Sequence, residues 1–168
     1  DSGNYVPSLL LESFAPPTSE ALLKNITQHR TIQFTLPGHP QTFKPLRFHR
    51  GRNVYAGHSK EMGLAKMQIG LQKPAGGPVS GKAVTLDVRL YFKRAKAHYK
   101  KDGTLKANAP KHVLKTPDVD NCLKFVQDAL EPTVIENDKL IVSATVTKMW
   151  CSSASEERTE IELLVYRD

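Results

Sequence analysis

The sequence contains few cysteines: Cys122 and Cys151 are the only two among 168 residues. A small secreted scaffold held together by disulfides carries several pairs, so this composition excludes that class and favours a reducing compartment. One bridge between the two thiols is the alternative that the composition leaves open.

Long hydrophobic runs are also absent. The longest, such as Leu9–Leu11, fall far short of the ~20 apolar residues that cross a bilayer. We find no internal repeat and no long low-complexity tract. The length lies within the roughly 100–200 residues of one domain. We therefore expect a single domain that does not cross a membrane.

Positive charge, by contrast, is abundant and concentrated in one segment. Residues 93–115 hold eight lysines and arginines against one acid, so this segment alone accounts for the formal net charge of +7. Its basic residues are Lys93, Arg94, Lys96, Lys100, Lys101, Lys106, Lys111 and Lys115. Residues 118–138 follow with six acids and one base.

A basic block of this density indicates a polyanionic partner, and nucleic acid is the most common one. An anionic membrane surface is the weaker alternative, because Gly103 and Pro110 interrupt the amphipathic helix that such binding uses. The third alternative is a solvated charged loop that binds no partner.

Hydrophobic periodicity predicts the secondary structure. Alternating apolar residues predict four strands, over 31–36, 84–92, 140–150 and 160–166, and helical spacing predicts helices over 59–72 and 116–130. The second helix is expected to begin at Thr116-Pro117, with Thr as the cap and Pro in the first turn. Residues 37–58, which include Arg47, Arg50 and Arg52, and residues 93–115 are expected to be loops.

These elements predict an α+β domain over residues 31–168, preceded by an extension over residues 1–30. We expect a small antiparallel or mixed sheet of about four strands, with the two helices on one face.

The acidic block has the composition of a metal site. Asp118 and Asp120 lie at the predicted start of a helix, where the helix dipole stabilises carboxylates. Asp138 lies in the turn before the next strand, from which it could return to the first two. Mg²⁺ prefers carboxylate oxygens, so these aspartates beside a basic segment are typical of a nuclease. Lys124 is four residues from Asp120 and could contact the scissile phosphate.

The spacing of these charged residues is also that of an ordinary solvent-exposed helix without a metal site. Asp120, Lys124 and Asp128 are spaced by four residues, as in a ladder of ion pairs along an exposed helix face. Residues 136–138 alone are also typical of a solvated turn.

Three short segments resemble the signature of the RusA-like Holliday-junction resolvases. They are Thr-Pro-Asp-Val-Asp-Asn-Cys-Leu-Lys at 116–124, Asp-Ala-Leu at 128–130, and Asn-Asp-Lys-Leu-Ile-Val at 137–142. That family has a PD-x-DN-x-x-K helix ending in DAL, then a turn with acids before a strand. The resemblance extends more loosely to the strand at Thr31, the basic residues from Arg47 to Arg52, and the strand at Val84.

The resemblance implies a homodimeric endodeoxyribonuclease that depends on Mg²⁺, with Mn²⁺ as an alternative ion, and nicks four-way DNA junctions symmetrically. It implies that Asp118, Asp120 and Asp138 bind the metal and that Lys124 is the catalytic or phosphate-contacting base. Branched DNA would then lie along the basic segment and along Arg47, Arg50 and Arg52.

Two other functions remain open from the sequence. The first is a non-catalytic module that binds DNA or RNA, with a structural acidic helix, and the second is a small basic interaction protein. For the nuclease we expect an intracellular compartment that contains DNA, which the sequence does not specify further.

Overall fold

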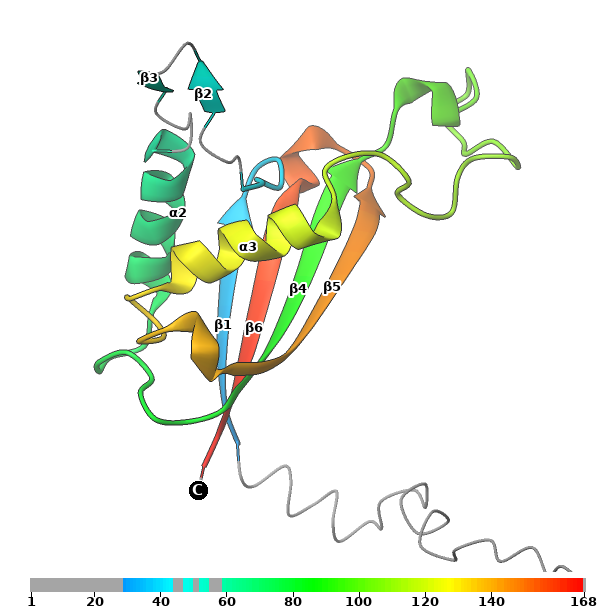
Figure 1. Ribbon diagram of the computed structural model, residues 1–168. Coiled ribbons are helices and arrows are strands. Elements are labelled where there is room, and N and C mark those ends of the chain that lie inside the picture. The colour runs from blue at the N-terminus through cyan, green and yellow to red at the C-terminus, as the bar shows by residue number, and fades with distance from the viewer. Residues whose placement is uncertain (1–28, 44–46, 50–51, 55–58, 168) are drawn as a thin grey trace, which may run out of the picture.

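The computed structural model describes residues 29–43, 47–49, 52–54 and 59–167. Its strands are β1 (His29–Pro37), β2 (Arg47–His49), β3 (Arg52–Val54), β4 (Val84–Lys93), β5 (Ile141–Cys151) and β6 (Arg158–Tyr166). Its α-helices are α2 (Ser59–Gln72) and α3 (Val119–Leu130), with short 3₁₀ turns at Lys96–His98, Asp138–Leu140 and Ala154–Glu156. Figure 1 shows α2 and α3 on one face of the main sheet.

The main sheet is mixed, with the strand order β1-β6-β4-β5. β6 pairs antiparallel with both β1 and β4, whereas β5 pairs parallel with β4 at the edge. The strands β1, β4 and β5 therefore run in the same direction, and their C-terminal ends lie at the same end of the sheet. This confirms the predicted α+β architecture with a small mixed sheet.

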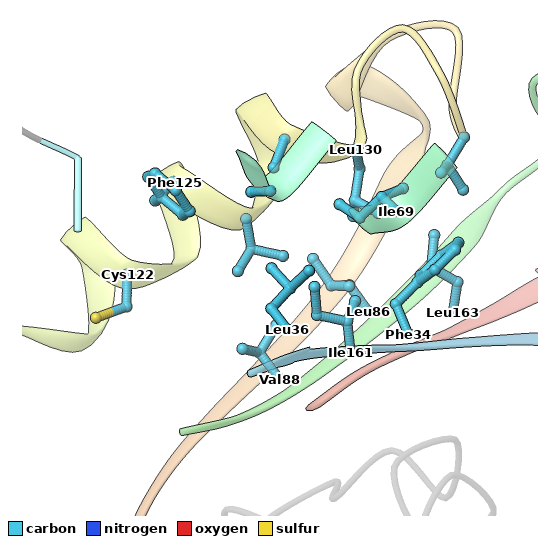
Figure 2. Close-up of a cluster of buried hydrophobic side chains, with 14 of the residues drawn as sticks. Phe34, Leu36, Ile69, Leu86, Val88, Cys122, Phe125, Leu130, Ile161 and Leu163 are labelled. Carbon is cyan, nitrogen blue, oxygen red and sulfur yellow. The ribbon is translucent and has the colours of Figure 1, made fainter. Parts of the chain in front are cut away.

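The core lies between the sheet and the two helices. Aligned positions on neighbouring strands, such as Phe34 on β1, Ile161 on β6 and Val88 on β4, are almost fully buried. The helix α3 covers them with the stripe that the sequence predicted: Cys122, Phe125, Val126, Ala129 and Leu130. Figure 2 shows Leu130 of α3 beside Ile69 of α2, with Phe125 and Cys122 further along α3.

The helix α2 has the predicted bounds but buries only part of its apolar surface. Ala65 and Ile69 pack into the core, and Met62 packs against it. Met67 and Leu71 are exposed instead. They do not share the face of Ile69, because positions two apart on a helix point in different directions.

The start of α3 differs from the prediction. The helix begins at Val119 with Asp118 as its N-cap residue, which has an extended backbone (φ −77°, ψ 147°), so Thr116 and Pro117 precede the helix. The carbonyl oxygens of Lys115 and Pro117 accept hydrogen bonds from the Lys148 side chain. The chain leading into α3 is thereby bound to β5 rather than wound into a first turn.

Two predicted loops contain local structure. Within residues 37–58, β2 and β3 pair antiparallel. Within residues 93–115, Tyr99 and Leu105 form an isolated antiparallel bridge, and Gly103 turns the chain with φ of 84°. Only His29 and Arg30 of the predicted N-terminal extension are described, and they begin β1.

In the part of the chain that the structure describes, no helix is long and apolar enough to cross a membrane.

Two neighbouring leucines on β6 test the packing. Leu163 is fully buried and Leu164 is half-buried on the other face. We expect Leu163→Ala to lower the free energy of unfolding by about 3 kcal/mol, because it leaves a cavity in the core. Leu164→Ala should cost about 1 kcal/mol or less. Urea denaturation measures both, and equal losses would contradict the assigned faces of β6.

Candidate active site

The beginning of α3 lies at the end of the sheet where β1, β4 and β5 finish. The Phe43 N–H donates to the Asn121 carbonyl at 2.8 Å, which ties the segment after β1 to α3. The Arg94 N–H donates to the Cys151 carbonyl at 3.1 Å and ties the ends of β4 and β5 together. A groove of about 460 Å³ lies here, lined by residues 39–42, 116–118 and 121.

One wall of the groove is fixed by Glu157. Its carboxylate accepts a hydrogen bond from the Lys93 N–H at 2.9 Å and lies 3.0 Å from Nδ1 of His39. Burial alone would raise the pKa of Glu157, but these two donors outweigh it and the pKa is lowered. Glu157 is therefore ionised at neutral pH and anchors the start of the groove.

Asp118 and Asp120 lie at the beginning of α3. Both are exposed, and neither carboxylate has a hydrogen bond or an ion pair with any other described residue. The free N–H groups and the dipole at this end of α3 attract negative charge. Two anionic groups without a counter-charge therefore lie beside the groove, and Asp118 lines it.

Lys124 lies one turn further along α3 and contacts two acids. Its Nζ is 2.9 Å from Oδ1 of Asp128 and 3.8 Å from Oδ2 of Asp138. The hydrogen bond to Asp128 is the main cause of a raised pKa for Lys124, burial opposes it, and the charges of Asp128 and Asp138 add to it. Lys124 is therefore a partly exposed cation at neutral pH.

Asp138 thus returns to α3, but at Lys124. It begins a 3₁₀ turn whose N-cap residue, Asn137, accepts a hydrogen bond from the Lys139 N–H at 3.1 Å. The ladder of ion pairs that the sequence offered as an alternative forms only in part, because Lys124 pairs with Asp128 but not with Asp120.

The donors at this site suit a hard cation, although they are not gathered around one point. Within the described residues, no three His, Cys, Asp or Glu side chains are close enough to hold one metal ion. The carboxylates of Asp118 and Asp120 nevertheless have free oxygens, which is the donor type that Mg²⁺ prefers. These oxygen donors are therefore of the chemical type that binds a divalent cation.

Lys148 is a residue of this site that the sequence analysis did not identify. It lies on β5 between Val146 and Trp150 at a position that faces the helices, aligned with Leu90 of β4. Its Nζ donates to the Pro117 carbonyl at 2.9 Å and also to the Lys115 carbonyl. The available signal was a lone charge at an inward position of an alternating strand.

Cys122 lies close to these charges but is chemically inert. Burial raises the pKa of its thiol to about 11, the charge of Lys148 opposes the rise, and those of Asp118 and Asp120 add to it. The thiol is therefore neutral at physiological pH and is no nucleophile. Cys122 and Cys151 are both free and buried, so the bridge that the composition left open does not form.

The predicted DNA-contacting residues fall into three groups. Seven basic side chains of residues 93–115 are exposed: Lys93, Lys96, Lys100, Lys101, Lys106, Lys111 and Lys115. Lys115 and the half-buried Arg94 approach the ring of Trp150. Arg47 and Arg52 lie on β2 and β3, and Arg50 lies outside the described residues.

The role of Lys148 gives a testable prediction. Lys148→Met should lower the free energy of unfolding by about 1–3 kcal/mol, because two carbonyl groups, that of Pro117 partly buried, lose their donor. The control Lys139→Met changes an exposed lysine and should stay within about 0.5 kcal/mol. Thermal denaturation compares the two variants, and equal effects would show that Lys148 does not hold the start of α3.

One comparison with known proteins bears directly on this arrangement. The family model described as endodeoxyribonuclease RusA matches residues 47–164, which is more than half of the chain and includes all of α3 and the acids discussed above. No curated protein matches the chain. The chain therefore belongs to the RusA family of endodeoxyribonucleases, enzymes that act on Holliday junctions.

Proposed function

We propose that this endonuclease depends on Mg²⁺ and nicks four-way DNA junctions symmetrically as a homodimer, with Asp118, Asp120 and Asp138 as the metal ligands. The observation that carries the proposal is the pair of exposed carboxylates at the start of α3, which have no partner among the described residues and lie beside a groove and a strongly basic segment. As an enzyme that acts on DNA, it works in a compartment that contains DNA.

The three aspartates are suited to hold Mg²⁺, and Mn²⁺ is the alternative ion. When bound, such an ion stabilises negative charge on the phosphate and activates water at neutral pH. Asp118 and Asp120 offer free carboxylate oxygens from the start of α3. Asp138 lies in the 3₁₀ turn before β5 and faces the same helix, where Lys124 is its ion-pair partner among the described residues.

Lys124 is the cation proposed to meet the scissile phosphate. Its raised pKa keeps it protonated at neutral pH. An ammonium group at this position stabilises charge that develops on the phosphate oxygens during cleavage. Asp128, at 2.9 Å, holds the Lys124 side chain along the surface of α3.

The basic segment supplies the charge that the aspartates would otherwise oppose. Phosphate groups and carboxylates repel each other, so a nuclease of this kind needs cations near its metal ligands. The seven exposed lysines of residues 93–115 begin at the last residue of β4 and precede Asp118 along the chain. We propose that they bind the phosphate backbone of the junction arms, together with Arg47, Arg50 and Arg52.

The homodimer is proposed from the symmetry of the substrate. Two matching nicks in a two-fold symmetric junction need two matching sites, which a closed dimer provides. The surface that best supports a second copy is the exposed apolar face of α2. Leu64, Met67 and Leu71 are 46%, 55% and 81% exposed and share one helix face at spacings of three and four residues.

The metal-ligand assignment predicts a separation of cutting from binding. Asp120→Asn should lower the rate of junction cleavage by at least about a hundredfold, because one anionic ligand is lost with little change in volume. Junction affinity should be retained. The control Asp87→Asn removes a carboxylate on β4 that pairs with Arg89, and it should cut at the wild-type rate.

Gel assays with labelled four-way junctions measure both properties. Wild-type cleavage by Asp120→Asn would contradict its assignment as a metal ligand.

The dimer face gives a separate prediction. A variant with both Met67→Glu and Leu71→Glu should place charge at the proposed contact and shift the protein from dimer to monomer. The control Val142→Glu introduces one such negative charge at a 65% exposed apolar position of β5. Light scattering should give about twice 18.7 kDa for the wild type and about 18.7 kDa for the double variant. A monomeric wild type, with and without junction DNA, would contradict the proposal.

A further inference from the structure

Trp150 is the only tryptophan of the chain, and basic side chains surround it. It lies near the end of β5, aligned with the buried Phe92 of β4. The guanidinium carbon of Arg94 is 5.3 Å from the centre of the Trp150 ring system, and Nζ of Lys115 is 5.4 Å from it. This aromatic ring therefore sits inside the most basic part of the molecule.

The basic segment around Trp150 is held in a defined shape. The Lys106 N–H donates to the His98 carbonyl at 2.9 Å, and the Lys100 N–H donates to the Thr104 carbonyl at 2.7 Å. Arg94 donates to the Pro110 carbonyl at 2.9 Å, which ties the two halves of the segment together. Figure 1 shows the segment projecting beyond the sheet between β4 and α3.

An open pocket of about 240 Å³, which we call the Trp150 pocket, lies between Trp150 and this segment. Its lining is mostly apolar and aromatic: Ala95, His98, Pro110, His112, Leu114, Lys115 and Trp150. The His98 ring meets Trp150 edge to face, with centroids 5.3 Å apart. Leu114 is 89% exposed at its rim, so a large apolar side chain faces solvent within a segment that carries the whole net charge.

Two ring nitrogens of this lining have unmet hydrogen-bonding capacity. Nδ1 of His98 and Nε1 of Trp150 are inaccessible to solvent and have no hydrogen-bond partner in the described structure. Buried polar atoms in proteins are nearly always paired, so the lining of this pocket is an exception.

We propose that the Trp150 pocket binds an unpaired base of the DNA substrate. The inference rests on the proposed binding of DNA along residues 93–115 and adds the recognition of a single base. Aromatic and apolar walls suit the faces of a base, and the surrounding lysines suit the phosphates on either side of it. A purely ionic interface with duplex DNA would need the lysines but neither the apolar lining nor the exposed Leu114.

The pocket is also joined to the proposed active site. Lys115, which lines the pocket, precedes Asp118 by three residues, and its carbonyl is held by Lys148. A base seated beside Lys115 would therefore fix which phosphate reaches the start of α3. The pocket would in this way choose the cleavage position next to an unstacked nucleotide, as occurs where strands exchange at a junction.

Intrinsic fluorescence tests this directly, because all tryptophan emission comes from Trp150. The full chain in EDTA is titrated with single-stranded oligothymidylate and with a blunt duplex of equal length. The single strand should quench the emission saturably, and the duplex should bind with much less quenching. Trp150→Phe should abolish the signal while it keeps an aromatic ring in the pocket.

Matched leucine variants separate the pocket from general charge. Leu114→Ser should weaken single-strand binding by about tenfold, within the range for loss of one base contact, and leave duplex binding unchanged. Leu105→Ser changes an exposed leucine of the same segment outside the pocket and should bind both DNAs like the wild type. Both sites are on the surface, so folding should be preserved.

Equal quenching by the two DNAs, or wild-type single-strand affinity in Leu114→Ser, would overturn the inference and leave the proposed nuclease function intact. Failure of the wild type to bind any DNA, four-way junctions included, would overturn the inference and the proposed function together.

Discussion

The packing of α3 across the inner face of the sheet is the constraint on which the rest of the molecule depends. Five buried side chains, from Cys122 to Leu130, fix the helix over the central strands. Because that stripe faces inward, the polar positions of the same helix face outward. Asp118, Asp120 and Lys124 are thus held on a rigid element, at the end where β1, β4 and β5 also finish.

A second consequence concerns charge. The basic segment leaves β4 and returns to the chain just before α3, so the fold itself brings the most positive and the most negative stretches together. Lys148 joins them by binding the two carbonyl groups that lead into α3. A phosphate backbone drawn to the lysines would therefore lie close to the carboxylates, which is the arrangement that hydrolysis by a divalent cation requires.

Much of the fold could be predicted from local pattern. The bounds of α2 and the buried stripe of α3 were correct, because periodic apolar residues reflect the faces that pack. The four strands of the main sheet were placed to within two residues at each end. Strand order was beyond reach, since nothing local indicates that β5 pairs parallel with β4 or that β6 enters between β1 and β4.

The sequence identified the acidic residues of the candidate site but not the residues that hold them in place. The family resemblance identified Asp118, Asp120, Lys124 and Asp138, and their metal-binding role stays a prediction. The start of α3 was misplaced at Thr116-Pro117, because local preferences favour Pro in a first turn while a distant lysine binds the carbonyl groups there. Lys148 and the walls around Trp150 depend on contacts between residues far apart in sequence, which single-sequence patterns do not contain.

Cleavage of a four-way junction with each strand labelled in turn tests the central claim most directly. With Mg²⁺ present, the account predicts nicks at matching positions in two opposite strands, and with EDTA in its place it predicts an intact junction. Cutting in EDTA, or nicks in one strand alone, would contradict a metal-dependent enzyme with two symmetric sites.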